Sequence, residues 1–216
     1  MTTRRRACLM AGSMFGAAVL PLAGCVSVGI GGDLPPHAHL RLTDAAAAPP
    51  VSLAVPLVPS LLVQALPADA LADTVSMAYA RERNRYNFYQ LSSWTERPVR
   101  LVPRLLQRRL EARGLAGAVA QLGEPVRADW LLTLAIDTLH HDLTTTPGRA
   151  RLALTVELID RRERQRVGRQ QFATDVTTAT DDAAGAAAAM SQALAQTFDA
   201  MLPWVEATLQ AQGPRS

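Results

Sequence analysis

The stretch Arg149–Asp160, which reads RARLALTVELID, carries the most regular pattern in the chain. Its positions 152, 154, 156 and 158 are Leu, Leu, Val and Leu, and the residues between them are Ala, Thr and Glu. An apolar period of two residues is typical of a strand with one buried face and one wetter face. This stretch therefore predicts a sheet that is covered on a single side.

Strands are also predicted on either side of this stretch. Residues 130–139 alternate in the same way, and residues 167–176 follow the charged stretch 161–165, which is typical of a hairpin tip. Gly148 favours a turn before the central strand. We expect the three strands to pair as antiparallel neighbours.

Two helices are predicted around these strands. The first begins near Glu96, has Pro98 in its first turn and ends at Gly114; Pro103 marks either a kink or the true start. The second is capped by Thr180, with a kink expected at Pro203. Its apolar stripe comprises Met190, Leu194, Phe198, Met201, Leu202, Val205 and Leu209. The predicted fold class is α+β, a mainly antiparallel sheet with two amphipathic helices packed on it.

The first part of the domain predicts shorter elements. Strands are expected at 39–42, 51–58, 75–80 and 86–91, with a charged hairpin tip at 81–85. Residues 60–73 are apolar without a clear period, which favours a loop or a short helix.

The N-terminal segment has the pattern of a bacterial lipoprotein signal peptide. Arg4, Arg5 and Arg6 precede an apolar stretch that ends in Leu22-Ala23-Gly24-Cys25, a lipobox. We expect residues 1–24 to be removed by cleavage between Gly24 and Cys25, and the Cys25 thiol to carry lipid. An uncleaved transmembrane anchor is the alternative, but the apolar run is shorter than the ~18 residues that a span needs and contains Pro21.

The leader sets the expected organisation and location. Residues 25–37, rich in Gly and Pro, predict a flexible tether, residues 38–210 the folded domain and residues 211–216 a disordered tail. Val26 follows Cys25 where an aspartate would favour retention at the inner membrane. We therefore expect the protein at the periplasmic face of the outer membrane, held by lipid.

Composition excludes several functional classes. The chain has 216 residues, half of them apolar, which suits a single domain with a real core. All 22 basic residues are arginine and three lie in the leader, which leaves 19 against 19 acidic residues. This balance argues against a nucleic-acid partner. Once Cys25 is lipidated and Cys8 removed with the leader, no thiol remains for catalysis or for a metal.

No catalytic, cofactor or metal site is predicted. His140-His141-Asp142 is interpreted as a solvated hairpin shoulder, because neighbouring imidazoles on a strand point to opposite faces and cannot share one ion. Ser92 and Ser93 lack a nucleophile-elbow context. The arginine-rich stretches 81–85, 100–113 and 161–166 are interpreted as solvated surfaces. The three tryptophans, Trp94, Trp130 and Trp204, indicate either core positions or a lipid groove.

Residues 89–98, YQLSSWTERP, introduce a family resemblance. With the lipobox, the helix 101–110, the three strands and the Ala-rich last helix, the chain resembles the ABC-type transport auxiliary lipoproteins, the PqiC/YmbA-like proteins that accompany MCE-type lipid transporters. His39-Leu40-Arg41-Leu42 stands where the family usually has Tyr-Tyr-x-Leu. The resemblance implies a docking module without catalysis, whose partner is an MCE-domain protein.

The sequence leaves three functions to be compared. The first is the lipid-anchored auxiliary component of an MCE-type transporter that moves lipids between the membranes, with a homo-oligomer possible at its strand edges. The second is an envelope lipoprotein that itself binds a hydrophobic ligand, in a cavity lined by residues such as Trp130 and Phe198. The third, a periplasmic hydrolase, requires a catalytic constellation that the sequence does not show.

Overall fold

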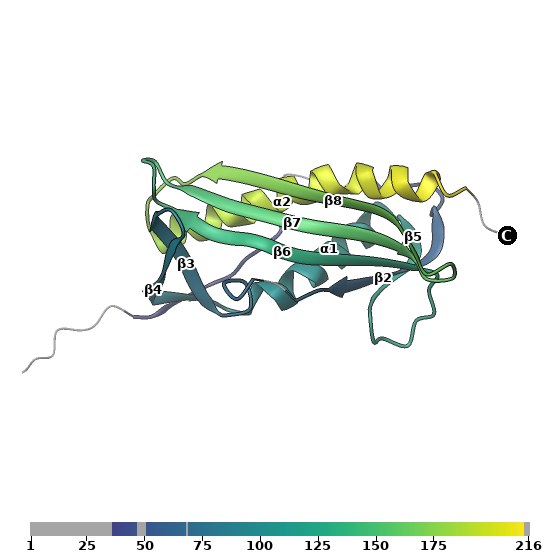
Figure 1. Ribbon diagram of the computed structural model, residues 1–216, viewed down its shortest axis with the longest axis horizontal. Helices are drawn as coiled ribbons and strands as arrows, with labels where there is room; N and C mark the ends of the chain where they lie inside the picture. Colours follow the sequence, from purple (N-terminus) through teal and green to yellow (C-terminus); the bar gives the residue numbers. More distant parts are fainter. Residues whose placement is uncertain (1–35, 47–50, 68, 214–216) are drawn as a thin grey trace, which may run out of the picture. The chain divides into compact units, whose positions relative to one another are not determined.

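Three long antiparallel strands form the largest part of the sheet (Figure 1). The computed structural model describes residues 36–46, 51–67 and 69–213, and β6 (Trp130–Asp142), β7 (Arg149–Asp160) and β8 (Gln165–Thr177) lie side by side within them. The alternation in β7 matches its burial, because every second side chain from Ala150 to Asp160 is buried. The three predicted strands are confirmed, and β6 runs beyond its predicted end at residue 139.

The other side of β6 is shared by two smaller groups of strands. β2 (Val58–Ala65) pairs with the beginning of β6 and carries β5 (Ala116–Gln121) on its far side, all in parallel. β3 (Ser76–Glu82) pairs in parallel with the end of β6 and forms an antiparallel hairpin with β4 (Arg85–Trp94). β1 (Ala38–Leu40) runs parallel to the last residues of β4. The eight strands thus form one mixed sheet, whose long ladders are antiparallel.

Both helices contribute to one hydrophobic core with the sheet. α1 (Pro98–Arg113) and α2 (Ala183–Gln210) bury their apolar residues against the inner side chains of β6 and β7. All seven residues of the predicted stripe on α2 are buried. The predicted α+β class, with two helices on one sheet, is confirmed.

The helix ends differ in part from the prediction. α1 begins at Pro98, two residues after the predicted start near Glu96, and Pro103 lies inside it. Gly114 follows the helix with φ of 70°, a left-handed conformation that glycine adopts without steric cost. For α2 the predicted cap Thr180 is wrong. Asp182 is the cap, because its carboxylate accepts a hydrogen bond from the Gly185 amide at 2.8 Å, and the Thr180 hydroxyl instead donates to Asp182.

The predicted strand 51–58 and the loop or helix at 60–73 are both wrong. Residues 51–57 are irregular, since Pro56 lacks an amide donor, and their chain is held to the end of α1 by the amide of Leu53, which donates to Arg113 O at 2.8 Å. The strand is β2, where Leu61, Leu62 and Val63 are all buried. Leu61 and Val63 face the main core, while Leu62 packs with Ala120 and Ala128 on the other side. A strand buried on both faces has no apolar alternation to reveal it.

Strand β5 was not predicted. Its sequence, Ala-Gly-Ala-Val-Ala-Gln, is poor in the β-branched and aromatic residues that favour strands. A side chain at Gly117 would place its Cβ 2.9 Å from the carbonyl oxygen of Pro59. The small residues therefore allow the close approach of β5 to β2.

The tryptophans lie mainly in the core. Trp94 and Trp130 are buried, and Trp204 is partly buried with its ring edge-on to Phe172 at a centroid distance of 5.9 Å. Phe198 is completely buried. Trp130 and Phe198, the residues that the ligand-binding hypothesis places around a cavity between sheet and helix, are both buried members of the main core.

Candidate functional site

Cys25 and Gly24, the predicted lipidation and cleavage residues, lie outside the described residues, as do the signal peptide and most of the tether. The structure does show where the tether enters the domain. Ala38 of β1 pairs with Ser92 of β4, so the described chain begins beside the β3–β4 hairpin. A fully extended chain from residue 25 to residue 37 spans at most about 40 Å. If Cys25 carries lipid, His37 at the start of β1 lies within that distance of the membrane.

One side of β4 has no neighbouring strand over most of its length. β1 pairs only with Ser92–Trp94, so the stretch Arg85–Leu91, here called the β4 edge, is not covered by any described strand on the side away from β3. Three of its large apolar side chains are exposed, Tyr86 by 43%, Phe88 by 39% and Leu91 by 47%. Unpaired backbone groups next to exposed apolar side chains can take up another extended segment.

The opposite border of the sheet, the free side of β8, has a different character. Its exposed residues are mostly polar or charged, and they include Arg166, Arg169 and Gln170. Arg166 and Arg169 both form ion pairs with Glu157 of β7. Charged edges resist pairing with other chains, whereas the β4 edge lacks this protection in its apolar part. The β4 edge is therefore the stronger candidate for an interaction site.

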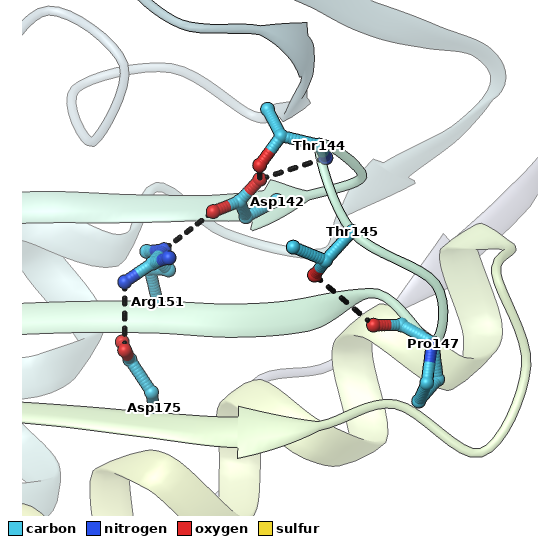
Figure 2. A network of polar contacts seen from close by, with 6 residues as sticks. All are labelled: Asp142, Thr144, Thr145, Pro147, Arg151 and Asp175. Carbon is cyan, nitrogen blue, oxygen red and sulfur yellow. Dashed lines mark hydrogen bonds and ion pairs between the residues drawn. The ribbon is translucent and has the colours of Figure 1, made fainter.

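A network of polar contacts joins the ends of β6, β7 and β8 next to the hairpin (Figure 2). Asp142 accepts hydrogen bonds from the amide and hydroxyl of Thr144, at 2.9 and 2.6 Å, and pairs with Arg151 at 2.6 Å. Arg151 reaches on to Asp175 at 2.7 Å. Burial raises the pKa of Asp142, but the bonds from Thr144 and Arg151 outweigh it and lower that pKa to about 2.

Asp142, Thr144 and Arg151 of this network line an open hollow of about 290 Å³. Tyr86 lines this hollow together with His140 and Asp142, and its ring lies edge-on to His140 at 5.1 Å. The predicted solvated shoulder at residues 140–142 is wrong, since all three side chains are buried. The cause is the extra length of β6, whose end is covered by the β3–β4 hairpin.

His141 lies on the other face of β6, inside a buried chain of hydrogen bonds. Its Nδ1 is 2.7 Å from the hydroxyl of Tyr89, and its Nε2 is 3.4 Å from the hydroxyl of Thr178. Thr178 and the amide of Gly148 both donate to Asp181 beside the start of α2. The prediction that the two imidazoles face opposite sides is confirmed. Burial lowers the pKa of both histidines and raises that of Tyr89 to about 12.

These buried groups predict that acid weakens the fold. Because burial depresses the folded-state pKa of His140 and His141 below 6.5, the unfolded chain binds more protons, and stability falls as pH drops below about 6.5. Below about pH 4 the protonation of Asp142 removes a further contribution. We expect the urea midpoint to be lower at pH 5 than at pH 7.5, and His141→Gln to reduce this difference. An equal midpoint at both pH values would contradict the assignment.

The surface arginines follow the prediction with two exceptions, Arg109 and Arg113, of which Arg113 is half-buried and pairs with Glu206 of α2 at 2.6 Å. Arg81 to Arg85 and Arg161 to Arg166 are exposed, as are Arg100, Arg104 and Arg108 on α1. Arg109 is buried, and its guanidinium pairs with Asp44 at 2.8 Å and with Asp199 at 3.2 Å. Arg109 therefore joins α1 to two other parts of the chain. One ion pair reaches the segment after β1, and the other reaches α2.

Sequence patterns did not reveal the β4 edge. In Arg85–Leu91 the apolar residues occupy both odd and even positions, and the register of β3 against β4 shifts between Ala78 and Ser76. Neither the buried face nor the free edge could be assigned from such a pattern. A signal was present only in composition, as three aromatic residues within four positions of a short hairpin strand.

The described residues contain neither a membrane-spanning helix nor a three-ligand metal cluster. None of their helices is long and apolar enough to cross a membrane. Nor do these residues bring together three or more His, Cys, Asp or Glu side chains that could hold a metal ion.

Comparison with known proteins identifies the family of this chain and proteins of similar fold. A family model described as the ABC-type transport auxiliary lipoprotein component matches residues 40–201. No curated protein matches significantly. Protein XCC0632 from Xanthomonas campestris is similar in structure, with a TM-score of 0.66 and 21% identity over 82% of this chain and 96% of that one. An uncharacterized protein is also similar in structure, with a TM-score of 0.55 and 16% identity over 72% of this chain and 96% of that one. These likenesses show the fold, and the family match shows that this chain belongs to the ABC-type transport auxiliary lipoprotein family.

Proposed function

We propose that this protein is the lipid-anchored auxiliary component of an MCE-type ABC transporter, held at the periplasmic face of the outer membrane through Cys25. In this role it docks the MCE-domain protein that carries lipids between the two membranes and performs no catalysis. Membership of the transport auxiliary family supports the general role. The lipobox at residues 22–25 supports the anchor, and Val26 supports the outer membrane.

The observation that carries the proposal is the β4 edge beside the entry of the tether. An extended segment of the partner can add to this edge as a further strand, with the backbone giving affinity and the exposed side chains of Tyr86, Phe88 and Leu91 giving specificity. Aromatic side chains supply most of the binding energy at many interfaces. Anchoring confines the edge to a thin layer beside the membrane, which raises its effective concentration for a partner that reaches this layer.

The chemistry of the polar groups fits a role in docking. Asp142, Asp175 and Arg151 are committed to one another. His141 is buried and bonded to Tyr89. In the network of Figure 2 the carboxylate of Asp142 is bonded to Thr144 and Arg151, and that of Asp175 is bonded to Arg151.

A charge on the β4 edge should weaken docking. We expect Phe88→Glu to lower the recovery of the MCE-domain protein at least about tenfold in envelope pull-downs, since it places a carboxylate where an aromatic anchor is buried on binding. The matched control is Gln170→Glu, which adds the same charge to the exposed β8 edge. The control should bind like the parent protein.

Two outcomes would count against this docking surface. Equal recovery with Phe88→Glu and Gln170→Glu would place the partner elsewhere on the domain. If Phe88→Glu instead reduces the particle size in size-exclusion chromatography while the MCE-domain protein stays bound, the edge joins copies of this chain.

A further inference from the structure

Two histidines at the start of the described chain face one serine. His37 and His39 are separated by one residue at the beginning of β1, so their side chains lie on the same face, and Ser93 lies opposite on β4. His37 Nε2 and His39 Nδ1 are each 3.0 Å from the Ser93 hydroxyl oxygen. The two rings are 5.0 Å apart between centroids. Two imidazole nitrogens from one strand therefore converge on a single point.

We propose that His37, His39 and Ser93 form a binding site for a divalent transition-metal ion of the Zn²⁺ type. Imidazole nitrogen is a preferred ligand of Zn²⁺, at about 2.0–2.1 Å, and the ion occupies the space between the two nitrogens with the Ser93 hydroxyl as a third, weaker ligand. Both histidines are exposed, so an ion can reach them. The remaining coordination positions are open to water, which makes this an exchangeable site.

The hydrogen bonds seen in the structure are compatible with this role. A serine hydroxyl has one proton, so it donates to one ring and accepts from the N–H of the other. A metal ion needs the unprotonated form of both nitrogens, which the alternative tautomer of the donating ring provides without moving the backbone. Among the described residues, no carboxylate is hydrogen-bonded to either ring, and the ion competes only with the serine contact.

Binding has a structural consequence at the junction of tether and domain. β1 is only three residues long, and the next contact along the chain is the bond from the Thr95 amide to Leu40 O at 2.8 Å. A metal held by His37, His39 and Ser93 adds a cross-link between β1 and β4 beside the β4 edge. It stabilises the paired state of β1 because the unpaired strand does not bring the three groups together.

The test is a Zn²⁺ titration of the full chain with Cys8 and Cys25 replaced by serine, so that no thiol competes. Calorimetry should show one Zn²⁺ per chain, and the melting temperature should rise with Zn²⁺. His37→Gln and His39→Gln should each weaken binding about tenfold or more and abolish the rise in melting temperature. His140→Gln, which alters a buried histidine outside this site, is the matched control and should bind Zn²⁺ like the parent chain.

The alternative is that the three side chains only hydrogen-bond to one another. In that case His37→Gln and His39→Gln lower the melting temperature without Zn²⁺, and the parent chain gains nothing from the ion. Binding that survives the double variant would equally overturn the proposal. Circular dichroism of each variant confirms that the domain remains folded, so that loss of binding reports on the ligands.

Discussion

Replacing Cys25 by alanine is expected to release the protein from the membrane almost completely. Cys25 is the predicted acceptor of the lipid, and each buried CH₂ group of an acyl chain contributes about 0.8 kcal/mol to membrane binding. Several acyl chains together give a firm anchor, and none of the described helices is able to cross a membrane. Fractionation of cells should therefore move the protein from the membrane pellet to the soluble fraction.

The same variant should abolish the proposed lipid-transport function, because an unanchored domain loses its concentration beside the membrane. The chain offers a matched control in Cys8→Ala, which removes the other cysteine from within the predicted signal peptide. Cys8→Ala should remain in the membrane fraction. Full function of Cys25→Ala, or equal fractionation of the two variants, would contradict the predicted anchor.

The second large effect concerns the buried arginine of α1. Arg109→Ala is expected to lower the free energy of unfolding by about 3–5 kcal/mol, because it leaves the partly buried Asp44 carboxylate without its partner and opens space between the helices. Arg109 also bridges to Asp199 of α2, so one substitution loosens the contact between both helices and the segment after β1. Urea denaturation of the chain in a Cys25→Ala background measures the change.

Two further variants separate charge from packing at this position. Arg109→Met keeps much of the side-chain volume and should cost less than Arg109→Ala. Arg108→Ala, one residue earlier on the exposed face of the same helix, should change stability by no more than about 0.5 kcal/mol. A similar cost for Arg108→Ala and Arg109→Ala would show that the buried ion pair is not a stabilising contact.

The elements that could be predicted are those with one buried face. β7 and α2 each meet water on one side and the core on the other, so their period of burial is visible in the sequence. β2 is covered on both faces by two separate clusters, and β5 is built from small residues that fit against it. Such strands are defined by their neighbours, and those neighbours come from distant parts of the chain.

The candidate sites depend on pairing that local sequence does not encode. Tyr86, Phe88 and Leu91 become an exposed edge only because β1 is too short to cover more than the last residues of β4. His37 and His39 fall at the predicted boundary of tether and domain, and the serine that they face is far along the chain in β4. Conversely, His140, His141 and Asp142 are adjacent in the sequence, but they do not form one site. Strand alternation places His141 on the opposite face of β6 from His140 and Asp142, and the side chains join different networks.

The most direct test of the account is the mass of the N-terminal peptide of the protein purified from the cell envelope. The proposed anchor predicts a chain that begins at Cys25, with a diacylglyceryl group on its sulfur and a further acyl group on its amine. An N-terminal peptide that retains residues 1–24, or that begins at Cys25 with an unmodified thiol, would contradict it.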